Sequence, residues 1–584
     1  MSMQPQPWPE VPAGTARIVK KAFRKGSLPI RVRDELGPWF DDERFAAAYG
    51  VRGAPGISPA QLAMVTVLQF TENLTDRQAA DAVRGHLDWK YCLGLALDDE
   101  GFDFTVLSEF RARLVAGDLE STIFEALLGR LVELGLLRAG GRARTDSTHV
   151  ISAVRDLNRL ELAGESVRAC LEALAAAAPD WLSGAVDVPD WARRYGARID
   201  SWRLPASQAK RAELAGAYGR DALTLLRAVG DEQAPGWLRE LPAVDVLRRV
   251  LVGNYLITTD TRGREVIRMR EADTDGLPPG RLRLSSPYDP DARWAAKGED
   301  LFWNGYKVHL TETCDDPGPD EPGADEPGAD EPGADEPAER PNLIVSVATT
   351  DATMPDAKMT EPIHAALAER DLLPGEHLVD SGYPSAELMV EAARRWGIAL
   401  VSPLLADQSR QARAGDGYSR AAFTIDFDAQ QATCPQGQAS TWWNEVTQRG
   451  TDAIVIKFAA DTCRPCPVRE QCTRSTRSRG IGRQLTVPPR EIHAAQQAAR
   501  AEQTTADWRA RYATRAGVEG TIRQAVAVTG IRRARYRGLP KTRLQHVFAA
   551  VALNLTRLDA YWNHHPLDRT RTSHLSRLDV ALAA

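Results

Sequence analysis

The sequence has 584 residues, of which 43% are hydrophobic and 26% are charged, as is ordinary for globular protein. This length is too great for one compact core and predicts two or three domains. No apolar run approaches the roughly 18 residues that a membrane span needs, and the N-terminal segment lacks the apolar stretch of a signal peptide. We therefore expect a cytoplasmic protein.

The charge is distributed unevenly along the chain. The formal net charge is −6, which taken alone argues against a nucleic-acid enzyme. Residues 315–340, however, hold eleven acids and one base, and the rest of the chain carries 72 Lys and Arg against 68 Asp and Glu. Residues 511–543 hold nine bases and one acid, Glu519. Such a local field attracts phosphates, although a solvated basic helix face is the alternative interpretation.

The first part of the chain reads as a tail followed by short helices. We expect residues 1–35 to be an N-terminal tail and residues 36–138 to form a helical domain. Helix start signals include a capping box at Thr75 and Gln78. Such a cluster of helices favours a helix-turn-helix-like DNA-binding domain, though helical clusters without that role are common.

A change to β-compatible sequence at residues 139–150 predicts the first strand of the next unit, and this strand carries Asp146. Residues 151–285 then read as a helical insertion that is dense in Leu, Ala and Arg. It contains no recognisable chemical constellation. A scaffold, a partner-contacting arm and a DNA clamp all remain open as its role.

Strand character returns within residues 286–404. The segments 302–313 and 342–353 are predicted to pair as a hairpin. Between them, residues 315–341 contain a repeated DEPGA unit. Its proline, glycine and repelling carboxylates cannot bury a core, so we expect a disordered loop that folding does not need. A helix, a strand ending at Asp380, a second helix and a further strand follow.

The order of these elements predicts an α/β fold class. One strand, a helical insertion, two strands and then alternating helices and strands match an RNase H-like core, which is a mixed sheet flanked by helices. In that order Asp146 lies on the first strand and Asp380 follows the fourth. An N-terminal all-helical domain, the helical insertion and a β-rich insertion complete the expected architecture.

Four of the seven cysteines are clustered within residues 405–505, which we expect to be the β-rich insertion. Cytosolic thiols stay reduced, so a disulfide framework is not expected, and the other three cysteines read as ordinary. A C-x2-C pair with two further thiols can close a tetrahedral Zn²⁺ site. The sequence therefore predicts a structural zinc site, or the vestige of one, at Cys434, Cys463, Cys466 and Cys472.

The last predicted unit, residues 506–562, precedes a tail at residues 563–584. Within it, Tyr512, Arg515 and Glu519 are spaced three and four apart. On one helix the three side chains would share a face.

Three carboxylates, those of Asp146, Asp380 and Glu519, could converge on divalent metal. Two Mg²⁺ ions held by such a set can activate an attacking oxygen and stabilise the leaving oxygen of a phosphodiester. Each residue also has a structural alternative, because aspartates after strands often cap helices or turns and a glutamate among arginines forms ion pairs. If the trio is wrong, the reserve carboxylates are Asp289, Asp291, Asp351 and Asp356.

These residues resemble a known family, the DDE transposases of bacterial insertion sequences in the group with a Y-x2-R-x3-E-x6-K signature. The resemblance rests on Asp146, on VDSGY around Asp380, on the Tyr512, Arg515 and Glu519 spacing, and on the segment RYRGLPKTRLQHVFAAVALNLTRL. The helical region containing LSEFRARL also resembles the N-terminal domain of that family.

The chain departs from the signature at one position. Six residues after Glu519 are followed by Val526, where the signature expects lysine. Arg523 lies one turn beyond Glu519 and could supply the missing phosphate contact.

The resemblance implies an enzyme that binds the terminal inverted repeats of an insertion sequence, cleaves the element's ends and joins them to target DNA. Two ions of Mg²⁺, or Mn²⁺, would be held by Asp146, Asp380 and Glu519. DNA would be contacted by Tyr512 and Arg515, with Arg523 and Lys541 as further backbone contacts.

The resemblance also implies partners and a location. Because two ends must be held together, a homodimer or higher multimer on DNA and a nucleoid-associated location are expected. Two other functions remain open. One is an RNase H-like nuclease without strand transfer, and the other is an inactive DNA-binding regulator.

Overall fold

The computed structural model describes residues 2–314, 340–405, 407, 409–415, 417–448, 450–473 and 481–565. All but the last two residues of the predicted acidic loop, and the predicted C-terminal tail beyond residue 565, lie outside the described residues. Over the described ranges, no helix is long and apolar enough to cross a membrane.

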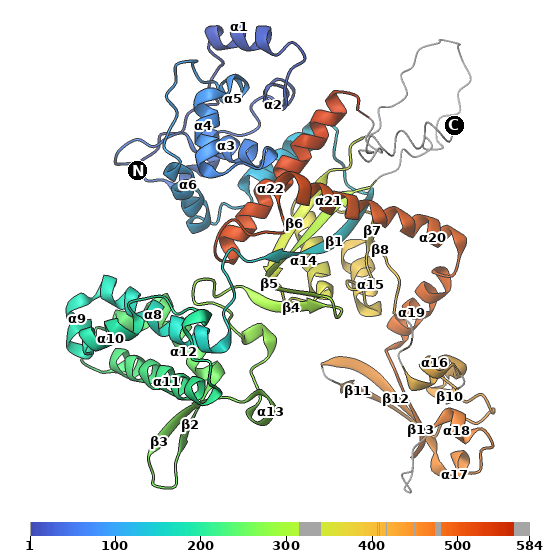
Figure 1. The fold of residues 1–584 in the computed structure, drawn as a ribbon. Helices are drawn as coiled ribbons and strands as arrows, with labels where there is room; N and C mark the ends of the chain where they lie inside the picture. Colours follow the sequence, from blue (N-terminus) through green and yellow to red (C-terminus); the bar gives the residue numbers. More distant parts are fainter. Residues whose placement is uncertain are drawn as a thin grey trace, which may run out of the picture.

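A six-stranded mixed sheet lies at the centre of the molecule (Figure 1). Its long strand β5 pairs antiparallel with β1 along one edge and with β4 and β6 along the other. The strand β1 also pairs in parallel with β7, which pairs in parallel with β8. The strands are β1 (Arg142–Ile151), β4 (Arg293–Lys297), β5 (Leu301–Thr313), β6 (Ile344–Asp351), β7 (Glu376–Val379) and β8 (Ala399–Val401).

This strand order, with two antiparallel and two parallel neighbours running from β6 through β5, β1 and β7 to β8, is compatible with an RNase H-like core. The predicted hairpin is confirmed, since β5 and β6 pair antiparallel from Tyr306 opposite Asp351 to Glu312 opposite Ile344. The helix predicted before Asp380 is also present, as η5 (Asp356–Met359) and α14 (Thr360–Ala368).

A long helix, α22 (Leu539–Trp562), joins the sheet to the N-terminal helices. Its middle is buried on all sides, as expected for a helix with neighbours all round. The buried side chain of Asn554 accepts a hydrogen bond from the Ile344 N–H and donates one to the Ile344 carbonyl, each at 2.8 Å. These bonds fix the helix against the start of β6.

Seven α-helices precede the sheet, and the predicted capping box of Thr75 and Gln78 is present. On α3, the ring of Phe70 stacks on Phe548 of α22 with 6.1 Å between centroids. Two of the helices form within residues 1–35, where a tail was expected, because Val19 and Ile30 are buried in a common cluster with Tyr91. The helices are α1 (Ala13–Ala22), α2 (Leu28–Leu36), α3 (Pro59–Thr71), α4 (Asp76–Gly85), α5 (Leu87–Leu93), α6 (Thr105–Ala116) and α7 (Thr122–Glu133).

The chain between β1 and β4 forms a helical body with its own hydrophobic cluster, seen at the lower left of Figure 1. Within it, the buried carboxylate of Glu165 accepts a hydrogen bond from the Tyr288 hydroxyl at 2.7 Å, which ties α8 to the segment that leads into β4. Its main elements are α8 (Arg159–Ala177), α9 (Pro179–Ala185), α10 (Val188–Tyr195), η2 (Ser201–Arg203), α11 (Gln208–Gly230), α12 (Pro242–Asn254), β2 (Tyr255–Thr259), β3 (Glu265–Met269) and η4 (Gly280–Leu282).

Between β8 and the C-terminal helices, the chain forms a second appendage at the lower right of Figure 1. It is rich in strands, as predicted, and has a hydrophobic cluster of its own. The helices α19 and α20 lead back from it to the sheet. Its elements include β9 (Thr424–Asp426), β10 (Gln431–Thr433), β11 (Trp442–Gln448), β12 (Thr451–Ala459), β13 (Ile481–Val487), α19 (Arg490–Glu502) and α20 (Ala506–Ala513).

Candidate active site

Asp146 and Asp380 are brought together by the parallel pairing of β1 and β7. Thr145 lies opposite Val379, so Asp146 in the middle of β1 lies beside Asp380, the residue that follows β7. Burial raises the pKa of Asp146 above its ordinary value, the Ser147 N–H and Arg515 oppose this, and the Asp380 carboxylate adds to the rise. The chain thus places two carboxylates side by side and partly withdrawn from water.

Arg515 joins Asp146 to Glu519. Its guanidinium lies 3.5 Å from Asp146 Oδ2 and 2.8 Å from Glu519 Oε1. Burial opposes the charge on Arg515, yet Tyr512, Asp146, Glu519 and Asp380 together raise the pKa of the guanidinium above its ordinary value. These four predicted residues are therefore close enough to the Arg515 guanidinium to interact with it.

Tyr512, Arg515 and Glu519 do not lie on one continuous α-helix, contrary to the expectation. Tyr512 lies in the last turn of α20, Arg515 lies in the 3-10 turn η8 (Thr514–Ala516), and Glu519 lies in the first turn of α21 (Gly517–Thr529). The tighter turn keeps the three side chains near one another. Tyr512 also stacks on Trp508, with ring centroids 4.9 Å apart.

The change of helix type occurs where Arg144 of β1 approaches the backbone. Its Nη1 donates to the Thr514 carbonyl at 2.7 Å. A β-carbon added at Gly517 would lie 2.1 Å from that nitrogen. Because Gly517 has no side chain, the Arg144 side chain of β1 has room to pack against the start of α21.

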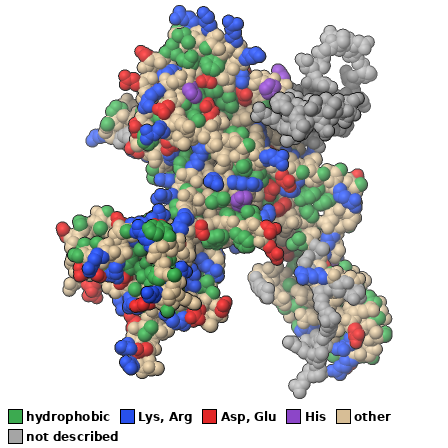
Figure 2. Space-filling model, viewed as in Figure 1, with side chains coloured by type: hydrophobic (Ala, Val, Ile, Leu, Met, Phe, Trp, Pro, Cys, Tyr) green, Lys and Arg blue, Asp and Glu red, His purple; other side chains and the backbone are tan. Residues whose placement is uncertain are grey.

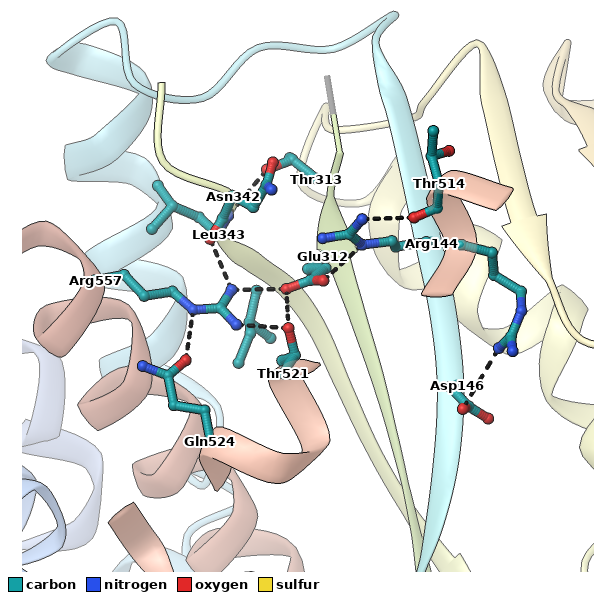
Figure 3. Close-up of polar contacts among 12 residues, drawn as sticks. Arg144, Asp146, Glu312, Thr313, Asn342, Leu343, Thr514, Thr521, Gln524 and Arg557 are labelled. Atoms are coloured by element: carbon teal, nitrogen blue, oxygen red, sulfur yellow. Dashed lines mark hydrogen bonds and ion pairs between the residues drawn. The ribbon is translucent and has the colours of Figure 1, made fainter. Parts of the chain in front are cut away.

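A buried carboxylate, Glu312 of β5, ties these elements together (Figure 3). It accepts hydrogen bonds from Arg144 Nε and Arg557 Nη1, each at 2.7 Å, and from the Thr521 hydroxyl. Burial alone would raise the pKa of Glu312, but the two guanidinium groups hold it below its ordinary value. Since Arg144 is two residues from Asp146 and Thr521 two residues from Glu519, this network sets the distance between the two carboxylates.

Glu312 was missed by the sequence reasoning. A signal was present, because Glu312 follows Val308 and Leu310 at alternate positions, so it points to the same side of β5 as two buried apolar residues. A charged group at such a position is paired when it is buried.

Asp146 and Glu519 line an open cleft of about 1080 Å³. Val526, which stands where the signature has lysine, also lines it, as does the predicted contact Arg523. The further cleft cations are Lys297, Lys307 and Arg532. Of these four cations only Lys307 forms an ion pair within the described ranges, with Asp356 at 2.8 Å. Lys541, the other predicted contact, is on the first turn of α22 and does not line the cleft.

Two segments of the chain match known protein families. Residues 19–113 match the family described as "Transposase domain (DUF772)", and residues 433–559 match the family described as "Transposase DDE domain". Both are transposase families, and the two matches indicate that the chain is a transposase. No curated protein and no solved structure matches the chain.

The two matched segments cover different parts of this transposase. The first runs from α1 to α6, and the second contains Tyr512, Arg515 and Glu519 together with the four clustered cysteines. Asp146 and Asp380 lie between the two segments, so their assignment depends on the geometry of the sheet.

The donor set of the transposase fits Mg²⁺ or Mn²⁺ by chemistry, since carboxylate oxygens are the ligands that these ions prefer. Within the part of the chain that the structure describes, however, no three His, Cys, Asp or Glu side chains are arranged so that they could already hold a metal ion. At these carboxylates, the Arg515 guanidinium pairs with both Asp146 and Glu519.

The four clustered cysteines of the transposase surround one small cavity of about 30 Å³. All four are free thiols. Burial raises the pKa of Cys472, Arg483 opposes this, and the other three cysteines add to the rise. The β-rich appendage thus gathers the predicted thiols, although no three of them form a ready metal site.

Proposed function

We propose that this transposase binds the terminal inverted repeats of an insertion sequence, cleaves phosphodiester bonds at the element's ends and joins them to target DNA on an RNase H-like core. The observation that carries the proposal is the gathering of Asp146, Asp380 and Glu519 around Arg515, beside an open cleft that Asp146 and Glu519 line. A cleft bounded by carboxylates and by unpaired cations suits a phosphodiester, which needs charge stabilisation at the bond that breaks and neutralisation along its backbone.

In this proposal Asp146, Asp380 and Glu519 hold two Mg²⁺ or Mn²⁺ ions. Bound there, such ions activate the attacking oxygen and stabilise the leaving oxygen. Glu519 lines the cleft, its side chain is 62% exposed, and it can turn towards the ions once Arg515 releases it.

Arg515 and Tyr512 contact the phosphate beside the cut. A guanidinium released by Asp146 and Glu519 offers two parallel N–H groups, a geometry that matches phosphate oxygens. Arg523 extends this contact along the cleft wall and takes the place of the missing lysine.

The domain assignment follows from the same proposal. Residues 36–138 bind the element ends as a helix-turn-helix-like domain, residues 139–150, 286–404 and 506–562 form the catalytic core, and residues 151–285 and 405–505 are insertions. Because two ends must be cut together, the active form is a homodimer or higher multimer on DNA.

The test is a cleavage and strand-transfer assay with labelled DNA that carries the inverted repeats flanking the gene. We expect Mg²⁺-dependent cutting followed by joined product. Asp146→Asn, Asp380→Asn and Glu519→Gln should each abolish cutting while end binding persists. Normal cutting by any of these variants would remove that residue from the site. Cutting without joined product would identify a nuclease, and binding without cutting an inactive regulator.

We also propose that Cys434, Cys463, Cys466 and Cys472 hold one structural Zn²⁺. Thiolates are the ligands that structural zinc sites use most, and small side-chain rotations could close the gathered thiols on one ion. Purified protein should carry about one zinc per chain and lose stability in chelator. Metal analysis that finds none, with stability unchanged by chelator, would overturn this proposal.

A further inference from the structure

Basic residues continue beyond the cleft along the strand β4. Lys297, at one end of β4, lines the cleft, and Arg293 lies at the other end of the same strand. Four residues of strand span about 13 Å, which is the length of roughly four base pairs along a duplex. The strand β4 therefore leads from the predicted site towards the helical insertion.

At the far end of β4 the chain gathers further arginines. Arg293 Nε donates to the Arg281 carbonyl at 2.7 Å, so η4 packs on the strand. Burial lowers the pKa of Arg293, and the charge of Arg249 on α12 lowers it further. Burial also lowers the pKa of Arg159, and the charges of Arg283 and Arg270 lower it further.

The arginines of this group form few ion pairs, although Asp351 and Asp291 partly offset the lowered pKa of Arg293. Arg159, Arg270, Arg281, Arg283 and Arg293 form no ion pair within the described residues, and Arg249 has only a distant one with Asp245, at 3.9 Å. By contrast, Arg227 pairs with Glu265 at 2.8 Å, and Arg193 pairs with Asp190 at 3.0 Å. Figure 2 shows Lys and Arg side chains gathered where the insertion meets the core.

A set of like charges held close together is unfavourable in the free protein and becomes favourable when a polyanion neutralises it. Arg249, Arg281 and Arg283 are exposed and available for such a contact. These arginines continue the row of basic residues that begins with Lys297 at the cleft. A ligand that contacts the whole row must reach from the cleft to the insertion, and a DNA duplex is long enough to do so.

We propose that the base of the helical insertion is a DNA clamp, in which Arg249, Arg281 and Arg283 grip the phosphate backbone of the duplex that leaves the cleft along β4. The inference rests on the proposed function, because it takes DNA as the substrate of the cleft. It gives the insertion the task of holding flanking DNA, independently of the sequence at the cut.

The test measures how the affinity of the full chain for DNA depends on salt. A fluorescein-labelled random-sequence duplex of about 30 base pairs is titrated by fluorescence anisotropy from about 50 to 300 mM NaCl. We expect Arg249→Gln/Arg281→Gln to weaken binding by about tenfold and to reduce the log–log salt slope by roughly 2, since each lost phosphate contact removes about 0.9. Arg249→Lys/Arg281→Lys should keep most of the slope, because the charge remains.

The matched control is Arg193→Gln/Arg227→Gln, which removes two arginines of the same insertion. These lie on α10 and α11, which pack on α8 and β3, and both are paired in the free protein. The salt slope of this control variant should equal that of the natural chain. An unchanged slope in the Arg249 and Arg281 variant, or an equal loss in the control, would overturn the clamp.

The clamp and the proposed function can fail separately. If the natural chain does not bind the duplex at any salt concentration, DNA is not the substrate and both proposals fall. If it binds and cuts element ends but the double variant retains the full slope, only the clamp is wrong. Thermal unfolding of each variant checks folding, and a duplex of about 10 base pairs should lose less affinity on substitution because it cannot reach both cleft and clamp.

Discussion

The carboxylate of Glu312 holds the guanidinium of Arg144 at 2.7 Å in the interior of the protein, and neither residue touches the cleft. Glu312 is fully buried and Arg144 is 11% exposed at its side chain. Through Thr514 and Thr521 this pair fixes both helical segments that carry Arg515 and Glu519. The spacing of the predicted site is thus set by an interaction one layer below it.

Glu312→Gln should lower the free energy of unfolding of the core by about 3–5 kcal/mol, because it leaves the guanidinium groups of Arg144 and Arg557 without their buried counter-charge. Urea unfolding followed by tryptophan fluorescence measures this. Asp428→Asn is the control, since Asp428 pairs with Arg490 at an exposed position and should contribute less than about 1 kcal/mol. Equal effects of the two substitutions would contradict the role of Glu312.

Gly517 and Gly520 provide a matched pair on one helix. Gly517→Ala places a β-carbon 2.1 Å from Arg144, so we expect a loss of about 1–3 kcal/mol of stability and loss of DNA cleavage. Gly520 has nothing within 4 Å of the same position, and Gly520→Ala should be neutral or stabilising by up to about 1 kcal/mol. Thermal unfolding and the cleavage assay together decide this, and a harmless Gly517→Ala would show that Arg144 is free to move.

Arg515→Ala should change metal binding and catalysis in opposite directions. Without the guanidinium, Asp146 and Glu519 lose a competing counter-charge, so added Mn²⁺ should raise the unfolding temperature more than it does in the natural chain. Cleavage should fall by about 100-fold or more because a phosphate contact is lost. Arg509→Ala, an exposed arginine on α20, is the control. A smaller Mn²⁺ effect in Arg515→Ala would mean that Arg515 does not compete for the carboxylates.

Acid should destabilise the core through its buried histidines. Burial lowers the pKa of His309 and of His364 from 6.5 to about 4, so both are neutral in the folded protein at neutral pH. Their stabilising contribution is complete above the unfolded value of about 6.5 and is lost as the pH falls towards 4. Unfolding temperatures measured between pH 7 and pH 4.5 should therefore decrease, and His364→Gln should flatten the decrease. The exposed-site control His565→Gln should leave it unchanged.

The central mixed sheet was accessible to sequence reasoning because it rests on local patterns. Alternating strands and helices predicted the central sheet, with Asp146 on the first strand and Asp380 after the fourth, whereas the parallel pairing of β1 and β7 came from the structure. Glu519 stood out as the one acid among nine bases.

Other features depended on contacts that no local pattern encodes. The 3-10 turn at Arg515 arises where Arg144, 370 positions from Thr514 along the chain, reaches its carbonyl. The ion pair between Arg515 and Asp146 likewise joins distant segments. Helical spacing alone predicted a continuous helix there, and tertiary contact overrode it.

The junction of β5 and β6 has a consequence for how this chain tolerates change. The Thr313 N–H donates to the Leu343 carbonyl at 2.9 Å, and the Leu343 N–H donates to the Thr313 hydroxyl at the same distance, so the two strands already meet before the acidic tract begins and after it ends. The ends of β5 and β6 therefore keep their positions in the sheet whatever the length of the segment that connects them. This junction is therefore a natural attachment point, where a fluorescent protein or an affinity tag could replace the tract while the distance between Asp146 and Glu519 stays as it is.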